Sequence, residues 1–561
     1  MAQTVSILVF CSLEAQEGAA GKKVPEPRHL EIPAVAKDSL TNVAKAAMPK
    51  IDLPEYFITG KAVIDLPEVE KQPAVEDSDS KDVVSLLNPT LSRTRETVEP
   101  AFGTKEQIEG TSVQSFNGKA FASLGTFFSP RAGVWFGQMV GDYRYAVDGQ
   151  YYRTEGFAPF TNCSGGSVNL QGNTTLKSYN PYLDQAAIQS KLTYKTDTYN
   201  WYGSPDPSIS RNREDFKLTA GLKNWNPSPI PYSADLGFEN FSVSDSSKTV
   251  DETRVDIAGS SSLMMASIPL NVTLRTFIGS VSYGNSSSGL FYLEATVASK
   301  LYVVGKLSLA GSLQGFIADG MDGQNILRLY PHLDAAYQLD DRHTVRATYA
   351  PEVKPVDLAS QVFANRYISA FSNIKHTDDQ QDATVAIESG WSDDVRTNIG
   401  VRVQSIMDYP LYADSLSQGV WLLAYGGRTT ITTFSSEVFA KLPANDYFAA
   451  TLTASLSNNS LTGNAVPYLP VFEVGARYGR QLAARWTGTV SLSLIHQRKD
   501  NVVNINTLPS ILLIGLRCEY QLLRQAGVFV DVQNLLNQQY EYWKGYQEDP
   551  FVVSAGVSVR W

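Results

Sequence analysis

A chain of 561 residues would ordinarily form several soluble domains, but one large barrel can absorb it, since each hairpin takes roughly twenty residues or more. The composition suits a barrel, with 43% hydrophobic residues, 28 Tyr and 24 Phe. A net charge of -10 without a basic stripe argues against a nucleic-acid partner, and the lack of any run of about eighteen apolar residues argues against a helical membrane protein.

Motifs for metal, redox or hydrolytic chemistry do not occur in the sequence. The three cysteines, Cys11, Cys163 and Cys518, are far apart, and the five histidines form no HxxxH pair. Neither GxSxG nor HExxH is found. We therefore expect no catalytic, cofactor-binding or metal-binding residues, no cofactor and no enzymatic activity.

The first part of the chain differs from the rest in its amino-acid composition. In residues 1–19, the apolar run Val5–Phe10 is interpreted as the remnant of a signal peptide whose start lies upstream. Residues 20–111 are rich in Pro, Glu, Asp and Lys and are predicted to be a disordered, acidic periplasmic segment. Its repeated Ile-Asp-Leu-Pro, at 51–54 and 64–67, could add as a strand to a periplasmic or barrel partner, or could be chance repetition in a linker.

From residue 112 to 561 the sequence alternates between apolar and polar residues with the period of a β-strand. Leu218, Ala220 and Leu222, for example, alternate with Thr219, Gly221 and Lys223. Short turns, such as those at 340–342, 391–394, 443–446 and 480–483, alternate with long loops, such as those at 350–377, 408–418 and 497–509. This pattern predicts an all-β, transmembrane antiparallel β-barrel of about 22 strands, within a range of 16 to 22, in the cell outer membrane.

The last eleven residues, FVVSAGVSVRW, show the alternation most strictly. They resemble the C-terminal insertion signal of bacterial outer-membrane barrels, in which the last strand ends on Phe or Trp. The resemblance implies that the outer-membrane assembly machinery inserts this chain into the lipid bilayer. The apolar face that would carry the signal consists of Phe551, Val553, Val557, Val559 and Trp561.

Further motifs point to a family. The run VQNLLNQQYEYW at 532–543, followed by Gly545-Tyr546 and the final strand, resembles the end of TonB-dependent receptor barrels. The stretches from Tyr349 to Thr377 and from Thr126 to Pro130 resemble the receptor-type barrels of the Bacteroidota and Chlorobi. The resemblance covers about 112–561 and implies passage of solutes across the outer membrane. It departs from the family in lacking a recognisable plug domain, so coupling to TonB is not carried over.

Two questions about function stay open at this stage. A plugless barrel needs a closure, which the N-terminal segment, the loop Ala350–Thr377 or a partner could supply. The barrel could instead be a structural subunit of an outer-membrane assembly or secretion complex. The residues predicted to line the lumen, either for solute passage or as ion pairs that hold the wall, are Lys217, Lys223, Arg517, Glu519, Asp531, Gln533 and Arg560.

Overall fold

The computed structural model describes residues 117–224, 230–245, 248–265, 268–321, 323–370, 372–414, 418–443 and 446–561. The predicted signal remnant at 1–19 and the predicted disordered segment at 20–111 lie outside these ranges. Within them the chain is nearly all strand, and α2 (Leu358–Ala364) is the α-helix. No helix in the described ranges is long and apolar enough to cross a membrane.

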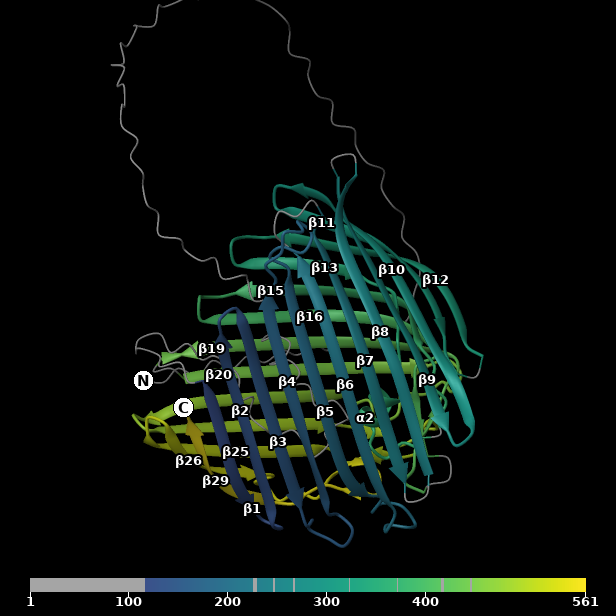
Figure 1. The fold of residues 1–561 in the computed structure, drawn as a ribbon. Coiled ribbons are helices and arrows are strands. Elements are labelled where there is room, and N and C mark those ends of the chain that lie inside the picture. The colour runs from purple at the N-terminus through teal and green to yellow at the C-terminus, as the bar shows by residue number, and fades with distance from the viewer. Residues whose placement is uncertain are drawn as a thin grey trace, which may run out of the picture. The chain divides into compact units, whose positions relative to one another are not determined.

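One antiparallel sheet closes on itself to form the wall (Figure 1). In the described part of the chain it contains 23 strands, of which the short β14 pairs only with one end of β15. The other 22 form a closed barrel, because β1 pairs with β2 on one side and with β29 on the other. The predicted barrel and strand number are confirmed.

The barrel strands are β1 (Gly118–Gly125), β2 (Ser129–Val140), β3 (Tyr143–Thr154), β4 (Cys163–Thr175), β5 (Ala187–Asn200), β6 (Ser210–Asn224), β7 (Tyr232–Asp245), β8 (Lys248–Met265), β9 (Ile268–Tyr283), β10 (Ser286–Val304) and β11 (Leu307–Asp319). They continue with β12 (Asn325–Gln338), β13 (His343–Tyr349), β15 (Thr377–Gly390), β16 (Val395–Met407), β19 (Arg428–Leu442), β20 (Asp446–Asn459), β21 (Phe472–Ala483), β22 (Trp486–His496), β25 (Ile511–Leu523), β26 (Ala526–Gln533) and β29 (Val552–Arg560). The short strands in loops are β14 (Glu352–Lys354), β17 (Leu411–Ala413), β18 (Leu422–Ala424), β23 (Arg498–Lys499), β24 (Thr507–Leu508), β27 (Glu541–Trp543) and β28 (Tyr546–Gln547).

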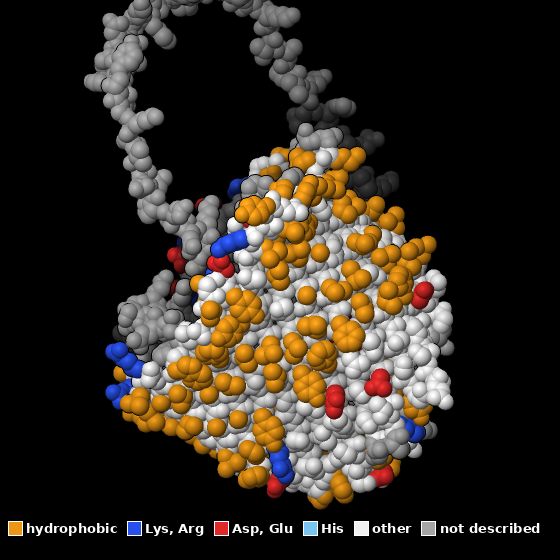
Figure 2. Space-filling model, in the orientation of Figure 1, with side chains coloured by type: hydrophobic (Ala, Val, Ile, Leu, Met, Phe, Trp, Pro, Cys, Tyr) orange, Lys and Arg blue, Asp and Glu red, His pale blue; other side chains and the backbone are white. Residues whose placement is uncertain are grey.

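The two faces of the wall differ as the alternation predicts. On β16, Ile399, Val401 and Val403 are all exposed on the outside. Arg402 and Gln404, at the alternate positions of the same strand, turn to the lumen. They donate hydrogen bonds to the carboxylates of Asp382 and Asp379 on β15. Figure 2 shows one outer face, on which hydrophobic side chains are spread over the strands and charged side chains are few. Such a surface suits the hydrocarbon of a bilayer.

The barrel has two unequal rims. The terminal rim, where β1 begins and β29 ends, carries mostly short turns, including those between β12 and β13 and between β15 and β16. The loop rim, at the opposite ends of the strands, carries the long connections after β13, β16, β20, β22 and β26. The predicted separation of short and long connections is confirmed, although 480–483 belongs to β21 and its turn comes after Ala483.

Residues 350–376, between β13 and β15, are called here the inward loop. Its α2 begins after Asp357, whose Oδ1 accepts a hydrogen bond from Ser360 N at 2.6 Å. Leu358, Ala359 and Val362 of the helix are buried. They pack in an apolar cluster with Phe241 of β7 and with side chains of β8 to β12 that point into the lumen. The core of this protein therefore lies inside the barrel, between loop and wall.

Candidate functional site: the inward loop and the lumen pocket

A buried charge triad fixes the inward loop to the wall. Asp197 of β5 accepts two hydrogen bonds from Arg213 of β6, at 2.6 and 2.9 Å. The same carboxylate accepts one from Arg366 Nη2 of the loop at 3.1 Å. All three side chains are nine-tenths or more buried. Two guanidinium groups thus share one carboxylate, which bridges loop and wall.

A second arginine holds the loop backbone. Arg211 is fully buried and is oriented by Asp245, whose oxygens lie 2.5 and 2.6 Å from its nitrogens. Its Nη1 donates to the carbonyls of Arg366 and Ile368, at 3.1 and 2.6 Å. The Tyr199 hydroxyl also donates to Arg366 O, at 2.7 Å. These bonds satisfy carbonyls that would otherwise be buried without a partner.

The N-terminal end of α2 is held by acidic and basic side chains of β8. Arg254 forms an ion pair with Asp357, the N-cap residue of the helix. Glu252 Oε2 accepts a hydrogen bond from Ala359 N at 3.0 Å, in the first turn. A carboxylate at this end of a helix accepts hydrogen bonds from backbone N–H groups that have no acceptor within the helix.

The C-terminal end of the loop is held by His376. Its Nδ1 lies 3.1 Å from Val356 N, so Nδ1 accepts, and Nε2 donates toward the carbonyls of Phe291 and Asp319, at 3.1 and 3.2 Å. Burial lowers the pKa of His376, and the two carbonyls oppose this effect only in part. The imidazole is therefore held neutral, with its single N–H on Nε2.

The loops of the loop rim meet in an aromatic cluster, called here the rim cluster. Its five central residues come from four different loops: Tyr367, Trp421, Tyr468, Trp543 and Tyr546. The rings of Tyr367 and Tyr546 are stacked, and the Trp421 indole N–H donates to the Tyr468 hydroxyl at 3.2 Å. All five residues are buried, and burial raises the pKa of the Tyr546 phenol. The rim cluster joins these loops to the inward loop.

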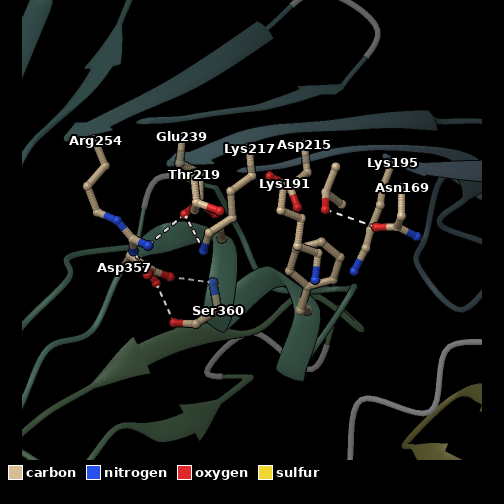
Figure 3. A pocket seen from close by; sticks show the side chains of 13 residues that line it. Asn169, Lys191, Lys195, Asp215, Lys217, Thr219, Glu239, Arg254, Asp357 and Ser360 are labelled. Atoms are coloured by element: carbon tan, nitrogen blue, oxygen red, sulfur yellow. Dashed lines mark hydrogen bonds and ion pairs between the residues drawn. The ribbon is translucent and has the colours of Figure 1, made fainter. Parts of the chain in front are cut away.

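A pocket of about 510 Å³, called here the lumen pocket, lies between α2 and the wall formed by β4 to β8 (Figure 3). This volume is in the range of small-molecule sites. Its floor is a row of residues that pair directly with one another across successive strands. The last residue of the row forms an ion pair with Asp357, the N-cap residue of α2. The row consists of Asn169, Thr193, Lys217, Glu239 and Arg254.

Within this row Lys217 and Arg254 share the carboxylate of Glu239, and Asp357 supplies a second carboxylate for the two cations. Glu239 Oε2 lies 3.1 Å from Lys217 Nζ and 2.6 Å from Arg254 Nη2. Thr193 Oγ1 donates to Asn169 Oδ1 at 2.9 Å. Figure 3 shows these contacts and the link from Arg254 to Asp357.

Three other charged residues of the pocket are not neutralised in this way. Among the described residues, neither Lys191 nor Lys195 of β5 has a carboxylate oxygen within 4.0 Å. Asp215 of β6 is 6% exposed, and its Oδ1 accepts no hydrogen bond from any residue that the structure describes. The ring of Phe363 from α2 forms a wall near them, with Lys195 Nζ 5.3 Å from its centroid.

The residues predicted to line the lumen lie on two parts of the wall, β6 and the strands β25, β26 and β29. Lys217 lies in the lumen pocket, and Lys223 lies further along β6, toward the terminal rim. A separate group joins β25, β26 and β29: Arg517 lies 2.8 Å from Asp531, and Arg560 lies 3.4 Å from Glu519. Gln533, the last residue of β26, pairs with Val552.

The residues of the predicted insertion signal lie on and beside β29. Phe551, Val557, Val559 and Trp561 are exposed, and Val553 is partly so. The Trp561 ring stacks on Phe136 of β2, with centroids 6.5 Å apart. Their role in insertion stays a prediction.

Sequence reasoning missed most of the pocket. Lys191, Thr193 and Lys195 alternate with apolar residues on β5, so the same alternation rule could have placed them in the lumen. Asp357 and Phe363 could not be assigned, because their partners lie more than a hundred residues away. Within the ranges that the structure describes, no three His, Cys, Asp or Glu side chains are grouped to hold a metal ion.

The closed 22-stranded barrel with long loops on one rim is the fold of TonB-dependent receptors. Neither a protein-family model nor a curated protein sequence matches the chain. Among solved structures, the FrpB iron transporter from Neisseria meningitidis (F3-3 variant) matches with a TM-score of 0.64 and 9% identity, over 80% of this chain and 82% of that one.

Two further structures are similar to a comparable degree. The copper transporter OprC has a TM-score of 0.60 and 12% identity, over 80% of both chains. The ferric-catecholate import receptor Fiu from K12 E. coli has a TM-score of 0.59 and 10% identity, over 80% of this chain and 82% of that one. The likeness confirms the predicted fold, a 22-stranded barrel like those of TonB-dependent receptors.

Proposed function

We propose that this chain is an outer-membrane barrel that passes a small hydrophilic solute, with the inward loop as its gate. The loop rim would face the exterior and the terminal rim the periplasm, where the segment 20–111 would lie. The apolar outer surface, the polar lumen and the likeness to transport barrels support this assignment. The Bacteroidota-type ancestry and the lack of a plug belong to the same proposal.

The observation that carries the proposal is the way the loop is docked. Charged groups of the loop and wall bond to each other at Asp197–Arg366 and Arg254–Asp357. These contacts are specific and they lie in the lumen, where water can take their place when the loop moves. Apolar packing of α2 holds the loop as well, but the charged contacts are the ones that can be exchanged for contacts with water when the loop moves.

The test is flux through proteoliposomes that contain the full-length chain. Arg366→Gln removes a bond between loop and wall, and Arg517→Gln removes an ion pair between the wall strands β25 and β26. We expect slow efflux of trapped glucose-sized solutes from the wild type and from Arg517→Gln, and clearly faster efflux from Arg366→Gln. Equal efflux from all three proteins would contradict a gate at this loop.

The alternative, a structural subunit of an assembly or secretion complex, predicts a different result. Vesicles would then be tight for the wild type and for both variants. Cross-linking from residues 20–111 would capture a periplasmic or barrel partner. Insertion by the outer-membrane assembly machinery is expected under both proposals.

A further inference from the structure

We propose that the lumen pocket binds a small solute that carries an oxyanion, a carboxylate or a phosphate, together with a hydroxyl or ammonium group. The oxyanion would lie between Lys191 and Lys195, and the donor group would bond to Asp215. This inference rests on the proposed transport function and names the class of solute for it.

In the described part of the chain, the lumen pocket holds two lysines whose charge is not balanced by an ion pair. Lys217 and Arg254 are balanced by Glu239 and Asp357, with two cations facing two carboxylates. Lys191 and Lys195 remain as cations that point into the same pocket without a carboxylate in ion-pair contact among the described residues. They are two residues from Thr193 on either side, so their Cα atoms are roughly 13 Å apart. Two extended lysine side chains can reach a single solute across that span.

The pocket also contains a buried carboxylate. Asp215 pairs directly with Lys195 across β5 and β6, yet it is not in ion-pair contact with it, and its Oδ1 is left without a hydrogen bond from the described residues. A buried acceptor without a partner is destabilising unless something else fills its place. Because Asp215 lines the pocket, a donor group of a bound solute can supply the missing bond.

The sides of the pocket differ in polarity. The Phe363 ring is fixed by Arg213, whose guanidinium lies 4.1 Å from the ring centroid. The ring forms a flat apolar side of the pocket. Thr193 and Asn169 form a polar side that can bond to hydroxyl groups. This combination fits a hydroxylated acid of the size of a monosaccharide better than an aliphatic or purely inorganic anion.

The test is calorimetric titration of the purified full-length chain with glucuronate, glucose 6-phosphate and glucose. We expect both anions to bind and glucose to bind at least tenfold more weakly, because it lacks the charged group. Binding of glucuronate should weaken as salt is raised. Equal affinity for glucose and glucuronate, or no heat from either anion, would overturn the proposal. Binding of one anion only would identify the oxyanion that the pocket prefers.

Variants separate the pocket from other basic surfaces. Lys195→Ala should weaken glucuronate binding about tenfold, and Lys195→Arg should restore most of it. Asp215→Asn should preserve the preference for the two anions over glucose. It should also weaken binding of the anions, because Asp215 accepts a hydrogen bond from their hydroxyl groups in this proposal. Lys177→Ala, at an exposed pair with Asp142 on the terminal rim, is the matched control and should change nothing. Unchanged binding in Lys195→Ala would overturn the assignment even if anions bind.

The binding and flux results are independent of each other. A chain that binds glucuronate but shows no flux in any variant would retain the pocket and refute transport. A chain with gated flux but no binding of either anion would retain transport and refute this site. Folding of each variant is checked by the shift in gel mobility between heated and unheated samples, so that loss of binding is scored only for closed barrels.

Discussion

Asp197 on the barrel wall and Arg366 in the inward loop are 169 residues apart in the chain, yet they form a hydrogen bond of 3.1 Å that is almost completely buried. Arg213 bonds to the same carboxylate from the neighbouring strand. The wall therefore presents a preformed Asp–Arg pair, and the loop completes it. Docking of the loop therefore adds a second charge-assisted hydrogen bond to a carboxylate that the wall already holds in place.

Arg366→Gln should undock the inward loop while the barrel stays closed. Asp197 keeps its two bonds to Arg213 in this variant, so the loss is that of one hydrogen bond between charged groups, typically about 1.5–3 kcal/mol. We expect amide hydrogens of α2 to exchange faster, with strand amides unchanged. Hydrogen exchange followed by mass spectrometry measures the difference.

Arg342→Gln provides the comparison for this variant. Arg342 and Asp393 form an exposed pair on the terminal rim, with 3.8 Å between their charged atoms. Exposed pairs contribute at most about 1 kcal/mol, so exchange of α2 should not change. If both variants left α2 equally protected, the buried triad would not be what holds the loop.

Gly419→Ala should disrupt the packing of the loops at the rim. Gly419 has a φ of +67°, and a Cβ there would lie 2.5 Å from the Gly203 carbonyl oxygen. Gly463→Ala has nearly the same backbone strain, at a φ of +70°, but its Cβ would meet nothing within 4 Å. We expect a loss of about 1 kcal/mol for Gly463→Ala from backbone strain alone, and about 2–4 kcal/mol for Gly419→Ala. Thermal unfolding of both variants tests this, and equal losses would show that the loops do not meet here.

The docked state of the inward loop should weaken as the pH falls below about 6.5. Burial lowers the pKa of His376, so the undocked loop binds a proton at a pH where the docked loop does not. Above about pH 6.5 the imidazole is neutral in both states and contributes no pH dependence. Below that value, docking loses stability until the pKa of the docked state is reached. Exchange of the inward loop at pH 7.5 and 5.5 measures this, with constant or rising protection at pH 5.5 as the contrary result.

Val401→Arg should impair the barrel in membranes. Val401 is in the middle of β16 and is exposed on the outer face. An arginine at the bilayer midplane of a barrel costs about 2–4 kcal/mol. Leu461→Arg, at an exposed loop position, should cost little. Denaturant unfolding in lipid vesicles compares the two, and an equal cost would argue against a lipid-facing surface on β16.

The sequence predicts the barrel well because its signal is local. Alternation with a period of two identifies each strand and its outward face, as on β16, and turn length separates the two rims. The same rule predicts a lumen position for Arg517 and Asp531, and the structure joins the two side chains in an ion pair between neighbouring strands.

The closure of the loop rim could not be predicted in the same way. The bonds of Arg366 and Asp357 join segments that are distant in sequence, and no local pattern specifies which wall they will meet. Aromatic residues show the same limit. Amphipathic rings at strand ends favour the boundary with the lipid headgroups, and Trp201 and Tyr202 follow the end of β5. In the structure, however, Trp201 is buried against Arg211 and Tyr202 packs on Tyr546 of the rim cluster.

The central claim is that the inward loop is a gate, and single-channel conductance of the full-length chain in a planar bilayer tests it most directly. Wild type and Arg366→Gln would be recorded under the same salt and voltage, with Arg517→Gln as the control. We expect rare, brief openings for the wild type and the control, and frequent or long openings for Arg366→Gln. Indistinguishable traces from all three proteins would contradict it.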